Sequence, residues 1–377
     1  MADRKEQYEA SELEVLAMMR RYAVLSLIAV LLFASLLAAC HPELPAEKTP
    51  LVVFCAGSLI LPFGALETAY ESQHPEVDVL NECHGSIQVI RHVTELHEQI
   101  DVVATADYAL IPMLMYAVED PDSGLPYASW AIRFATNHLA LAYGPHSDFA
   151  GEINTENWYE VITRPGVSLG IADPRFDASG YRALMALKLA EHHYEQPGIL
   201  DSVIQEQFTT PINVFQAGSL ALITVPEILE TIPQSPVVIR GASIQLIGLL
   251  ESGDLDYAFE YESVIRQHGL EWVALPEAIN LGSSQFNEQY QQVQINLNFQ
   301  RFTSVQPFFR GEQIGYGITI PSNAPHPELA EQFIAFLVGE QGQQIMADNF
   351  QPLLDPLTCD FPDLVPASLQ AYCHPDG

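Results

Sequence analysis

Basic residues are scarce in this sequence. Of its 377 residues only 15 are Lys or Arg, against 48 Asp or Glu, so the formal net charge is −33 at pH 7. Nucleic-acid binding draws most of its affinity from Lys and Arg on phosphates, and docking on anionic lipid needs basic clusters. The composition therefore excludes a nucleic-acid partner. Taken alone, it favours a cationic or neutral ligand.

The sequence also lacks the motifs of the common enzyme classes. It contains no GxSxG, HExxH, Walker A or GxGxxG pattern, each of which would indicate a specific catalytic or cofactor site. The adjacent His192 and His193, and the pair His92 and His97, have spacings that do not suit a metal site on one helix face. Carboxylate pairs arise by chance among 48 acids. We therefore predict that the protein is not an enzyme and has no cofactor.

The first 40 residues carry a pattern of their own. Arg20 and Arg21 precede an uncharged stretch, residues 22–39, which ends in Leu-Leu-Ala-Ala before Cys40. A positive segment, an apolar segment and small residues are typical of a secretory signal, and a Cys directly after Leu-Ala-Ala resembles a bacterial lipobox. We predict a signal peptide over residues 1–39, then a lipidated Cys40 and a tether over residues 40–50. The alternative is an uncleaved anchor, because 18 apolar residues are marginally long enough to span a membrane.

Either interpretation places the body of the protein outside the cytoplasmic membrane, in the periplasm or on the cell surface. A lipid on Cys40 would also make the membrane a partner. The segment before Arg20 is long and acidic for a signal peptide, so the start codon is left open between Met1, Met18 and Met19.

Four cysteines remain besides Cys40, namely Cys55, Cys83, Cys359 and Cys373. An even number in an oxidising compartment suggests disulfides. Cys359 with Cys373 would staple the C-terminal tail, and Cys55 with Cys83 would join two neighbouring strands. Free buried thiols are the alternative, and the spacing matches no zinc motif.

The rest of the chain alternates between short apolar runs and helical patterns. This alternation predicts an α/β protein that binds ligands at the carboxyl ends of its strands. The length suits two lobes, one from residues 51–136 and 312–377 and one from residues 137–311. The expected strands are residues 51–54, 77–80, 101–104, 139–143, 167–171, 236–239 and 314–320, and the clearest helices are residues 181–193 and 327–338.

Two Gly-Ser pairs carry the first chemical signal. Gly57 and Ser58 follow the first predicted strand, Gly85 and Ser86 follow the second, and each pair precedes a helix. A helix N-terminus presents unpaired N–H groups and a partial positive charge, so it holds anions without Lys or Arg. The alternative is that each pair is only a turn and a helix cap.

Two further segments end in polar groups. Asp177, Ala178 and Ser179 lead into another helix, where Asp177 either caps the helix or contacts a ligand. The run DYAFEY brings Tyr261 to the end of a predicted strand, although a buried Tyr is more often a core residue.

These segments recur together in one family. The shared motifs resemble the tungstate/molybdate-binding proteins of ABC transporters, in the archaeal-type branch, and extend from about residue 51 to about residue 354. They are AGSL at 56–59, HGS at 84–86, ATADYALIP at 104–112, FATN at 134–137, DPxxDxxGYR at 173–182, GLLESGDLDYAFEY at 248–261, QHGLEWVALPEAINLG at 267–282 and YGITIPSNAPHPELAEQFIAFL at 316–337.

The resemblance implies a type II periplasmic-binding-protein fold, in which two α/β lobes joined by a hinge close on an oxyanion in the cleft between them. It also implies a ligand site, with Asp177 as a possible direct ligand of molybdenum or tungsten. The implied site consists of Gly57, Ser58, Ser86, Asp177, Ala178, Ser179, Ser243 and Tyr261.

Ser243 departs from the family pattern. The family has a Glu there that supplies a second carboxylate to a six-coordinate metal centre, and a Ser hydroxyl is a poor ligand for such a centre. Three possibilities follow: Asp177 acts alone, a neighbour such as Gln245 or Glu260 substitutes, or the oxyanion stays tetrahedral. We predict the last.

The resulting hypothesis is a monomeric lipoprotein that captures tungstate or molybdate for the permease and ATPase subunits of an ABC importer. The alternatives are another oxyanion on the same fold, or a sensor or enzyme on that scaffold. Amides, hydroxyls and helix ends can hold a small anion, so the charge of −33 does not exclude an anionic ligand.

Overall fold

The computed structural model describes residues 15–28, 30, 48–298 and 307–375. Residues 15–28 are helical and exposed. Among the described residues, no helix has both the length and the apolar character that crossing a membrane requires. Cys40 and most of the predicted tether lie outside the described residues, so lipidation of Cys40 stays a prediction.

From Thr49 onwards the chain forms one compact unit. Its largest sheet has seven strands, formed by segments near both ends of this unit. Their spatial order is β16 (His374–Pro375), β15 (Leu353–Asp360), β4 (Ala131–Thr136), β14 (Gly315–Thr319), β3 (Val102–Thr105), β1 (Thr49–Ala56) and β2 (Val77–His84).

Two further sheets are formed by the middle of the chain. The five-stranded sheet runs β11 (Glu271–Ala274), β5 (Leu139–Tyr143), β10 (Tyr257–Tyr261), β6 (Leu169–Ala172) and β9 (Val237–Arg240). The four-stranded sheet runs β13 (Phe308–Arg310), β12 (Val293–Leu297), β8 (Leu220–Val225) and β7 (Asn213–Ala217).

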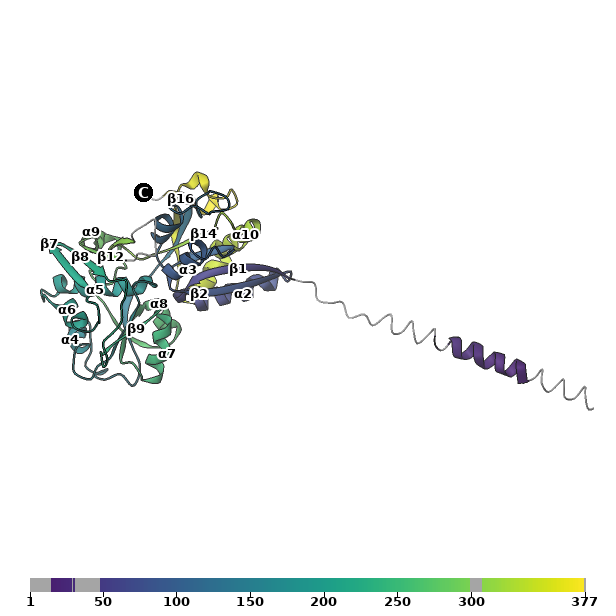
Figure 1. Cartoon of the computed structure of the whole chain (residues 1–377), viewed down its shortest axis with the longest axis horizontal. Helices are drawn as coiled ribbons and strands as arrows, with labels where there is room; N and C mark the ends of the chain where they lie inside the picture. Colours follow the sequence, from purple (N-terminus) through teal and green to yellow (C-terminus); the bar gives the residue numbers. More distant parts are fainter. Residues whose placement is uncertain (1–14, 29, 31–47, 299–306, 376–377) are drawn as a thin grey trace, which may run out of the picture. The chain divides into compact units, whose positions relative to one another are not determined.

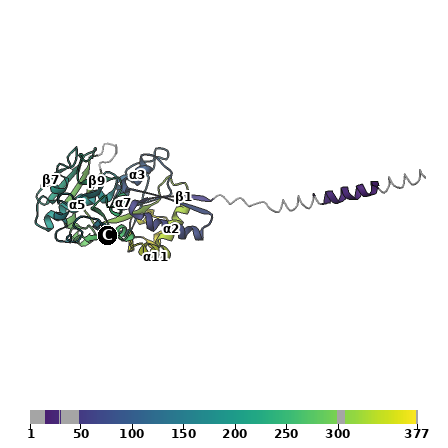
Figure 2. The same cartoon turned by 90° about the horizontal axis from the view of Figure 1, so that it is seen from below.

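We call the part that forms the seven-stranded sheet lobe 1 and the part that forms the other two sheets lobe 2. The chain leaves lobe 1 after β4, enters lobe 2 at β5, and returns to lobe 1 at β14. In Figures 1 and 2, β7 and α5 (Ala178–His193) lie at one end of the body and β1 and α2 (Ile60–Gln73) at the other. The boundaries at residues 136 and 312 stay a prediction, because the body is a single compact unit.

Helices cover the sheets and begin directly after several strands. In lobe 1 they are η1 (Gly57–Leu59), α2, α3 (Ser86–Thr94), the π-helix η2 (Ile111–Met115), α10 (Pro327–Val338), α11 (Glu340–Asp348), η4 (Pro362–Leu364) and η5 (Gln370–Tyr372). In lobe 2 they are α4 (Trp158–Val161), α5, α6 (Ile199–Ile204), α7 (Ile244–Ser252), α8 (Glu262–Gln267), η3 (Ser284–Phe286) and α9 (Asn287–Tyr290).

Parallel pairing positions the loops at one edge of each sheet. β1 pairs in parallel with both β2 and β3, and β6 pairs in parallel with β9 and β10. β3 and β6 are fully buried, which explains their short apolar sequences, and β10 is fully buried although it contains Glu260. The carboxyl ends of parallel strands meet at one edge, so the loops after β1, β2 and β3 gather there.

Most predicted elements match those observed. The ranges 139–143 and 327–338 coincide with β5 and α10, and the other predicted strands overlap β1, β2, β3, β6, β9 and β14. The four-stranded sheet was not predicted. Its strand β7 is mostly exposed, so it shows neither an apolar run nor a clear alternation.

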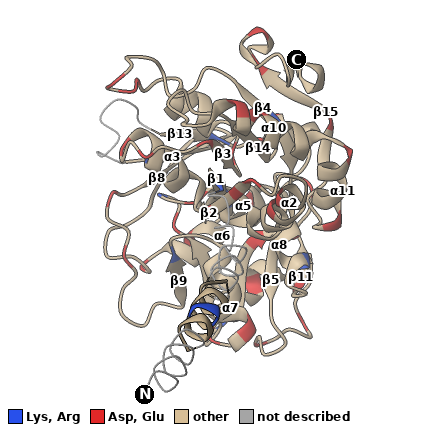
Figure 3. Ribbon diagram, turned by 90° about the vertical axis from the view of Figure 1, so that its right-hand side faces the viewer, with Lys and Arg blue, Asp and Glu red and all other residues tan. Residues whose placement is uncertain are grey.

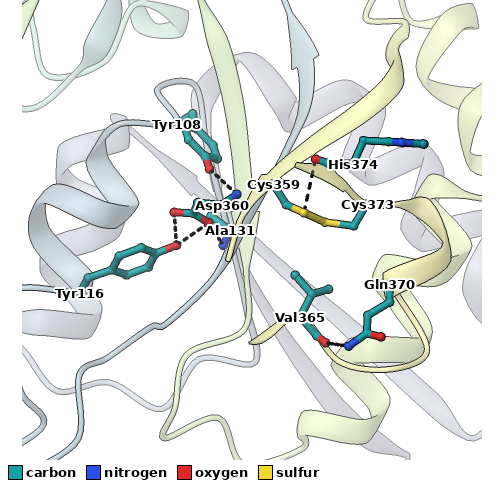
Figure 4. The surroundings of a disulfide bond; sticks show 9 residues. All are labelled: Tyr108, Tyr116, Ala131, Cys359, Asp360, Val365, Gln370, Cys373 and His374. Atoms are coloured by element: carbon teal, nitrogen blue, oxygen red, sulfur yellow. Dashed lines mark hydrogen bonds between the residues drawn. A yellow bond between two sulfur atoms is a disulfide. The ribbon is translucent and has the colours of Figure 1, made fainter. Parts of the chain in front are cut away.

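Both suggested cysteine pairs are disulfides. Cys55 in β1 is bonded to Cys83 in β2, and the two residues are register partners in the sheet. Cys359 in β15 is bonded to Cys373 beside β16, so the C-terminal tail is held to lobe 1 (Figure 4). Next to it the Asp360 carboxylate accepts a hydrogen bond from the Tyr116 hydroxyl at 2.7 Å (Figure 4).

Acidic residues are spread over the elements of both lobes, whereas Lys and Arg are few (Figure 3). The acidity therefore does not come from one acidic segment.

Candidate functional site

The two Gly-Ser pairs lie where the sequence placed them. Gly57 and Ser58 follow β1 directly, and Gly85 and Ser86 join β2 to α3. All four residues are buried. Because β1 and β2 are parallel neighbours linked by the Cys55–Cys83 disulfide, both pairs lie at the same edge of the lobe 1 sheet.

Ser58 is connected to the crossing between the lobes. Its Oγ lies 2.9 Å from the Tyr316 hydroxyl. That hydroxyl oxygen accepts a hydrogen bond from Asn137 Nδ2 at 3.0 Å. Asn137 lies between β4 and β5, and its Nδ2 also donates to Ser263 Oγ in lobe 2 at 2.8 Å. If Tyr316 accepts from Asn137 and donates to Ser58, the Ser58 proton is not used in this network.

Ser86 accepts a hydrogen bond rather than donating one. The backbone N–H of Ala106 donates to Ser86 Oγ at 2.9 Å. This bond uses a lone pair of the hydroxyl oxygen and leaves its proton for another acceptor.

The start of α3 contacts lobe 2 directly. The N–H groups of Ile87 and Gln88 donate to the carbonyl oxygen of Phe176 at 3.0 and 3.3 Å. From the sequence we expected the unpaired N–H groups of this helix to bind an oxyanion. In the structure, the N–H groups of Ile87 and Gln88 instead donate to a carbonyl oxygen of lobe 2. The approach is close enough that a Cβ on Gly85 would lie 2.3 Å from Phe176 O.

Asp177 caps α5, so the first of its two predicted roles, helix cap or ligand contact, is observed. Its Oδ1 accepts from the Ser179 N–H at 2.8 Å and from Ser179 Oγ at 2.9 Å. Its Oδ2 accepts from the Ser243 N–H at 3.1 Å, so the residue also ties α5 to the start of α7. Ala178, the first residue of α5, is buried beside it. The cap does not exclude ligand contact, because Oδ2 accepts one donor and has a lone pair left.

Ser243 lies beside Glu260 at the carboxyl end of β10. Ser243 Oγ donates to Glu260 Oε1 at 3.0 Å, and the N–H of Tyr261 donates to the same oxygen at 2.7 Å. The other oxygen, Glu260 Oε2, is buried and has no hydrogen-bond partner in the described part of the chain. Gln245, the other residue considered as a substitute for the family Glu, is exposed.

A buried arginine joins the two lobes. Arg182 in α5 donates to the Tyr261 hydroxyl at 2.7 Å and to the Ala106 carbonyl oxygen of lobe 1 at 2.6 Å. Its Nη2 lies 3.3 Å from Asp107 Oδ2, and the Tyr181 hydroxyl also donates to that carboxylate. Because Tyr261 accepts from Arg182, its own proton is not used in this bond.

Burial shifts the protonation equilibria of this cluster. It raises the pKa of the Glu260 carboxyl to about 8, and the negative charge of Asp177 adds to the increase. Burial also raises the pKa of Asp177, although its three hydrogen bonds act in the opposite direction. For Arg182, burial acts to lower the pKa, but Tyr261 and Asp107 outweigh it and the net shift is upward.

The structure thus gathers the predicted side chains around one set of buried contacts between the lobes. Sequence reasoning missed Arg182, Asp107, Tyr316 and Asn137, all of which lie inside the quoted motifs but have no distinctive spacing. The second AGSL sequence, at residues 217–220, is the exposed turn between β7 and β8, where Gly218 has a φ of 63°. It faces a surface hollow of about 500 Å³ that is also lined by α5 and is unrelated to this cluster.

Within the described ranges, no group of three or more His, Cys, Asp or Glu is arranged to hold a metal ion. The buried carboxylates Asp177 and Glu260 lie in one cluster with hydroxyls and an arginine, which suits hydrogen bonding to a polar ligand.

Comparisons with known proteins agree with this architecture. The model of the bacterial extracellular solute-binding protein family matches residues 51–350. The molybdate/tungstate-binding protein WtpA of Thermococcus kodakarensis is 36% identical over 351 residues, which are 90% of this chain and 93% of that protein. A solute-binding protein of Methanoculleus marisnigri is 39% identical over 311 residues, which are 82% of this chain and 83% of that protein.

Two solved structures show the same fold at low sequence identity. The periplasmic molybdate-binding protein of Azotobacter vinelandii superposes with a TM-score of 0.52 at 15% identity, over 81% of this chain and 99% of that chain. The sulfate-binding protein SubI of Mycobacterium tuberculosis gives 0.52 at 14% identity, over 87% and 93%. The predicted two-lobe, type II periplasmic-binding-protein fold is confirmed, and the chain belongs to the bacterial extracellular solute-binding protein family.

Proposed function

We propose that this solute-binding protein captures tungstate or molybdate between its lobes. The observation that carries the proposal is a shared arrangement of three buried hydroxyls. Ser86 and Tyr261 accept hydrogen bonds from protein donors, and Ser58 does so when Tyr316 donates to it. Each then keeps its own proton for a ligand acceptor. The curated WtpA relatives from Thermococcus kodakarensis and Pyrococcus abyssi carry molybdate and tungstate in their names, which supports this choice of anion.

The binding energy would come from hydrogen bonds to a charged acceptor in a dry site. Such bonds contribute about 1.5–3 kcal/mol each when water is excluded. Several of them are enough for micromolar to nanomolar affinity after the cost of association. Gly57 would allow close backbone approach, and Asp177 would orient Ser179 and the start of α5.

Export and transport complete the proposal. The family is extracellular, and the N-terminal pattern supports a lipid on Cys40 that holds the protein at the outer face of the cytoplasmic membrane. The permease and ATPase subunits of an ABC importer would then receive the anion.

Calorimetric titration of residues 41–377 with tungstate, molybdate, sulfate and phosphate tests the ligand. We expect tight binding of the first two and weak or no binding of the others. No heat with tungstate or molybdate, together with tight binding of another anion, would sink the assignment. X-ray absorption on the complex would distinguish a tetrahedral anion, which we expect, from a six-coordinate metal.

One observation favours a second candidate ligand. Ser243 stands where the resemblance implies a carboxylate, and its hydroxyl is already bonded to Glu260. A site with Ser243 in place of that carboxylate also suits a different tetrahedral oxyanion on the same fold. The same titration distinguishes the two, because sulfate or phosphate would then bind more tightly than tungstate.

A further inference from the structure

Glu260 combines deep burial with an incomplete set of hydrogen bonds. Only 1% of its surface is exposed. Oε1 accepts two hydrogen bonds, from Ser243 Oγ at 3.0 Å and from the Tyr261 N–H at 2.7 Å. Oε2 is enclosed by protein and, among the described residues, has no partner. A buried polar atom without a partner costs about 1–3 kcal/mol, so this oxygen needs an explanation.

The two bonds to Oε1 determine where a proton on Glu260 would reside. A carboxyl oxygen has two lone pairs in its plane, and on Oε1 both face donors. A proton on Oε1 would have to displace one of these bonds. The neutral form of Glu260 therefore carries its proton on Oε2, where it is a hydrogen-bond donor without a protein acceptor.

The charges around Glu260 favour this neutral form. The Asp177 carboxylate, at the start of α5, is bonded to the backbone of Ser243, the residue whose hydroxyl binds Glu260. Asp107, from the loop after β3, is the second buried carboxylate in the cluster, and Arg182 of α5 is the cation that faces it. On the lobe 1 side, burial raises the pKa of the Tyr316 hydroxyl and the charge of Glu260 adds to the increase, so Tyr316 stays neutral and supplies no cation. One guanidinium cannot balance three carboxylates and a dianionic ligand.

We propose that neutral Glu260 donates a hydrogen bond from Oε2 to an oxygen of the bound oxyanion, and that this proton is part of the recognition. The inference rests on the proposed function and extends it. The side chain then acts as a fourth donor beside the hydroxyls of Ser58, Ser86 and Tyr261. It replaces the second metal-ligating carboxylate implied by the resemblance with a proton donor to a tetrahedral anion.

The pKa of about 8 supports this protonation state near neutral pH. Burial is the main cause of the increase, the hydrogen bond from the Tyr261 N–H opposes it, and the charge of Asp177 adds to it. The binding-competent, protonated form predominates below pH 8 and is lost as the pH rises through that value. Burial raises the pKa of Tyr261 and Tyr316, so both hydroxyls stay protonated over the same range.

The experiment is a titration of wild type and Glu260→Gln with tungstate between pH 6 and pH 9.5. Glutamine keeps the Oε1 acceptor for Ser243 and Tyr261 and places an N–H donor at the position of Oε2. We expect wild-type affinity to fall roughly thirtyfold between pH 7 and pH 9.5, which is the loss set by a pKa of about 8. Glu260→Gln should bind within about threefold of wild type at pH 7 and show no such decline. Glu262→Gln, on the partly exposed neighbour in α8, is the matched control and should keep the wild-type profile.

Proton uptake gives a second readout. Above pH 8, binding should draw close to one proton from the buffer, measured as the dependence of the binding heat on the ionisation enthalpy of the buffer. Glu260→Gln should draw none. A flat affinity profile in the wild type, or a loss of more than tenfold in Glu260→Gln at pH 7, would overturn the inference while leaving the proposed function intact. Wild type that binds neither tungstate nor molybdate at pH 6 would refute the proposed function, and the inference with it.

Discussion

The serines on the two sides of the site are used in opposite ways. In lobe 1, Ser86 accepts a hydrogen bond from the backbone and keeps its proton, and Ser58 is hydrogen-bonded to the hydroxyl of Tyr316. In lobe 2, Ser179 and Ser243 donate their protons to the carboxylates of Asp177 and Glu260. The two lobe 1 serines thus keep their protons for a ligand, whereas the two lobe 2 serines are bonded to buried carboxyl groups.

This difference separates ligand binding from structural support. Hydroxyl protons left free by the protein are suited to an anion, while hydroxyls bonded to buried carboxyl groups offset the cost of burying those groups. We therefore expect substitutions of the lobe 1 serines to act mainly on affinity. Substitutions of the lobe 2 serines, or of the Arg182–Asp107 ion pair, should act mainly on stability.

The largest effect is expected for Arg182→Met. Without the guanidinium, the buried Asp107 carboxylate loses its cation, and the free energy of unfolding should fall by about 3–5 kcal/mol. Urea denaturation monitored by circular dichroism measures the change. Arg164→Met is the control, because its ion pair with Glu152 at 2.7 Å is solvent-exposed and should contribute less than about 1 kcal/mol. Equal losses of unfolding free energy in the two variants would show that the buried ion pair between the lobes contributes no more stability than an exposed one.

Gly85→Ala should break the contact between the lobes without disturbing either one. The backbone of Gly85 has a φ of −61°, which alanine adopts readily, yet the added Cβ would lie 2.3 Å from Phe176 O. We expect a loss of affinity for tungstate of about a hundredfold, because the closed state is blocked. Gly64→Ala is the control, since nothing lies within 4 Å of its added Cβ. A Gly85→Ala variant that binds tungstate as tightly as Gly64→Ala would show that binding does not need the close approach of Gly85 to Phe176.

Ser86→Ala and Ser179→Ala compare the two sides directly. Ser86→Ala removes a free proton and should weaken tungstate binding at least tenfold, roughly the value of one charge-assisted hydrogen bond. Ser179→Ala keeps the backbone N–H bond to Asp177 and loses only the hydroxyl bond. It should lower the free energy of unfolding by about 1 kcal/mol with a smaller change in affinity. The reverse pattern in calorimetry and thermal melting would reject the division between the two sides.

The smallest effect concerns salt. The acidic residues lie over both lobes, so their field repels an approaching anion from either side (Figure 3). Raising the ionic strength from about 0.01 to 0.15 M shortens the Debye length from about 30 to 8 Å. The association rate of tungstate in stopped-flow fluorescence should therefore rise severalfold. A rate that falls with salt would mean that the site attracts anions at long range.

Sequence patterns predicted the elements that carry the Gly-Ser loops because buried parallel strands are continuous apolar runs. They predicted Ser58, Ser86, Asp177 and Tyr261 as site residues, because their motifs lie at the ends of such strands or at the start of a helix. They could not identify Tyr316 as the partner of Ser58, because 258 residues separate the two. The pairing depends on the antiparallel return of β14 to β3, which local periodicity does not encode.

The state of Glu260 was also beyond the sequence. The DYAFEY segment shows an acid in an apolar strand, and only the three-dimensional arrangement shows two donors on one of its oxygens and none on the other. Within the four-stranded sheet, the edge strand β7 escaped prediction for a different reason, since it is mostly exposed and lacks an apolar run.

The Cys55–Cys83 disulfide holds Ser58 and Ser86 close together before any ligand binds. It joins β1 to β2 three residues before Ser58 and three residues before Ser86, so a covalent bond limits any change in their separation. If the lobes part as the proposed function requires, these two donors move together, and the open protein would already present the lobe 1 side of the proposed site. Under the proposed function, the entropy cost of ordering these two donors is met during oxidative folding, and anion binding then has to order only the lobe 2 side of the site.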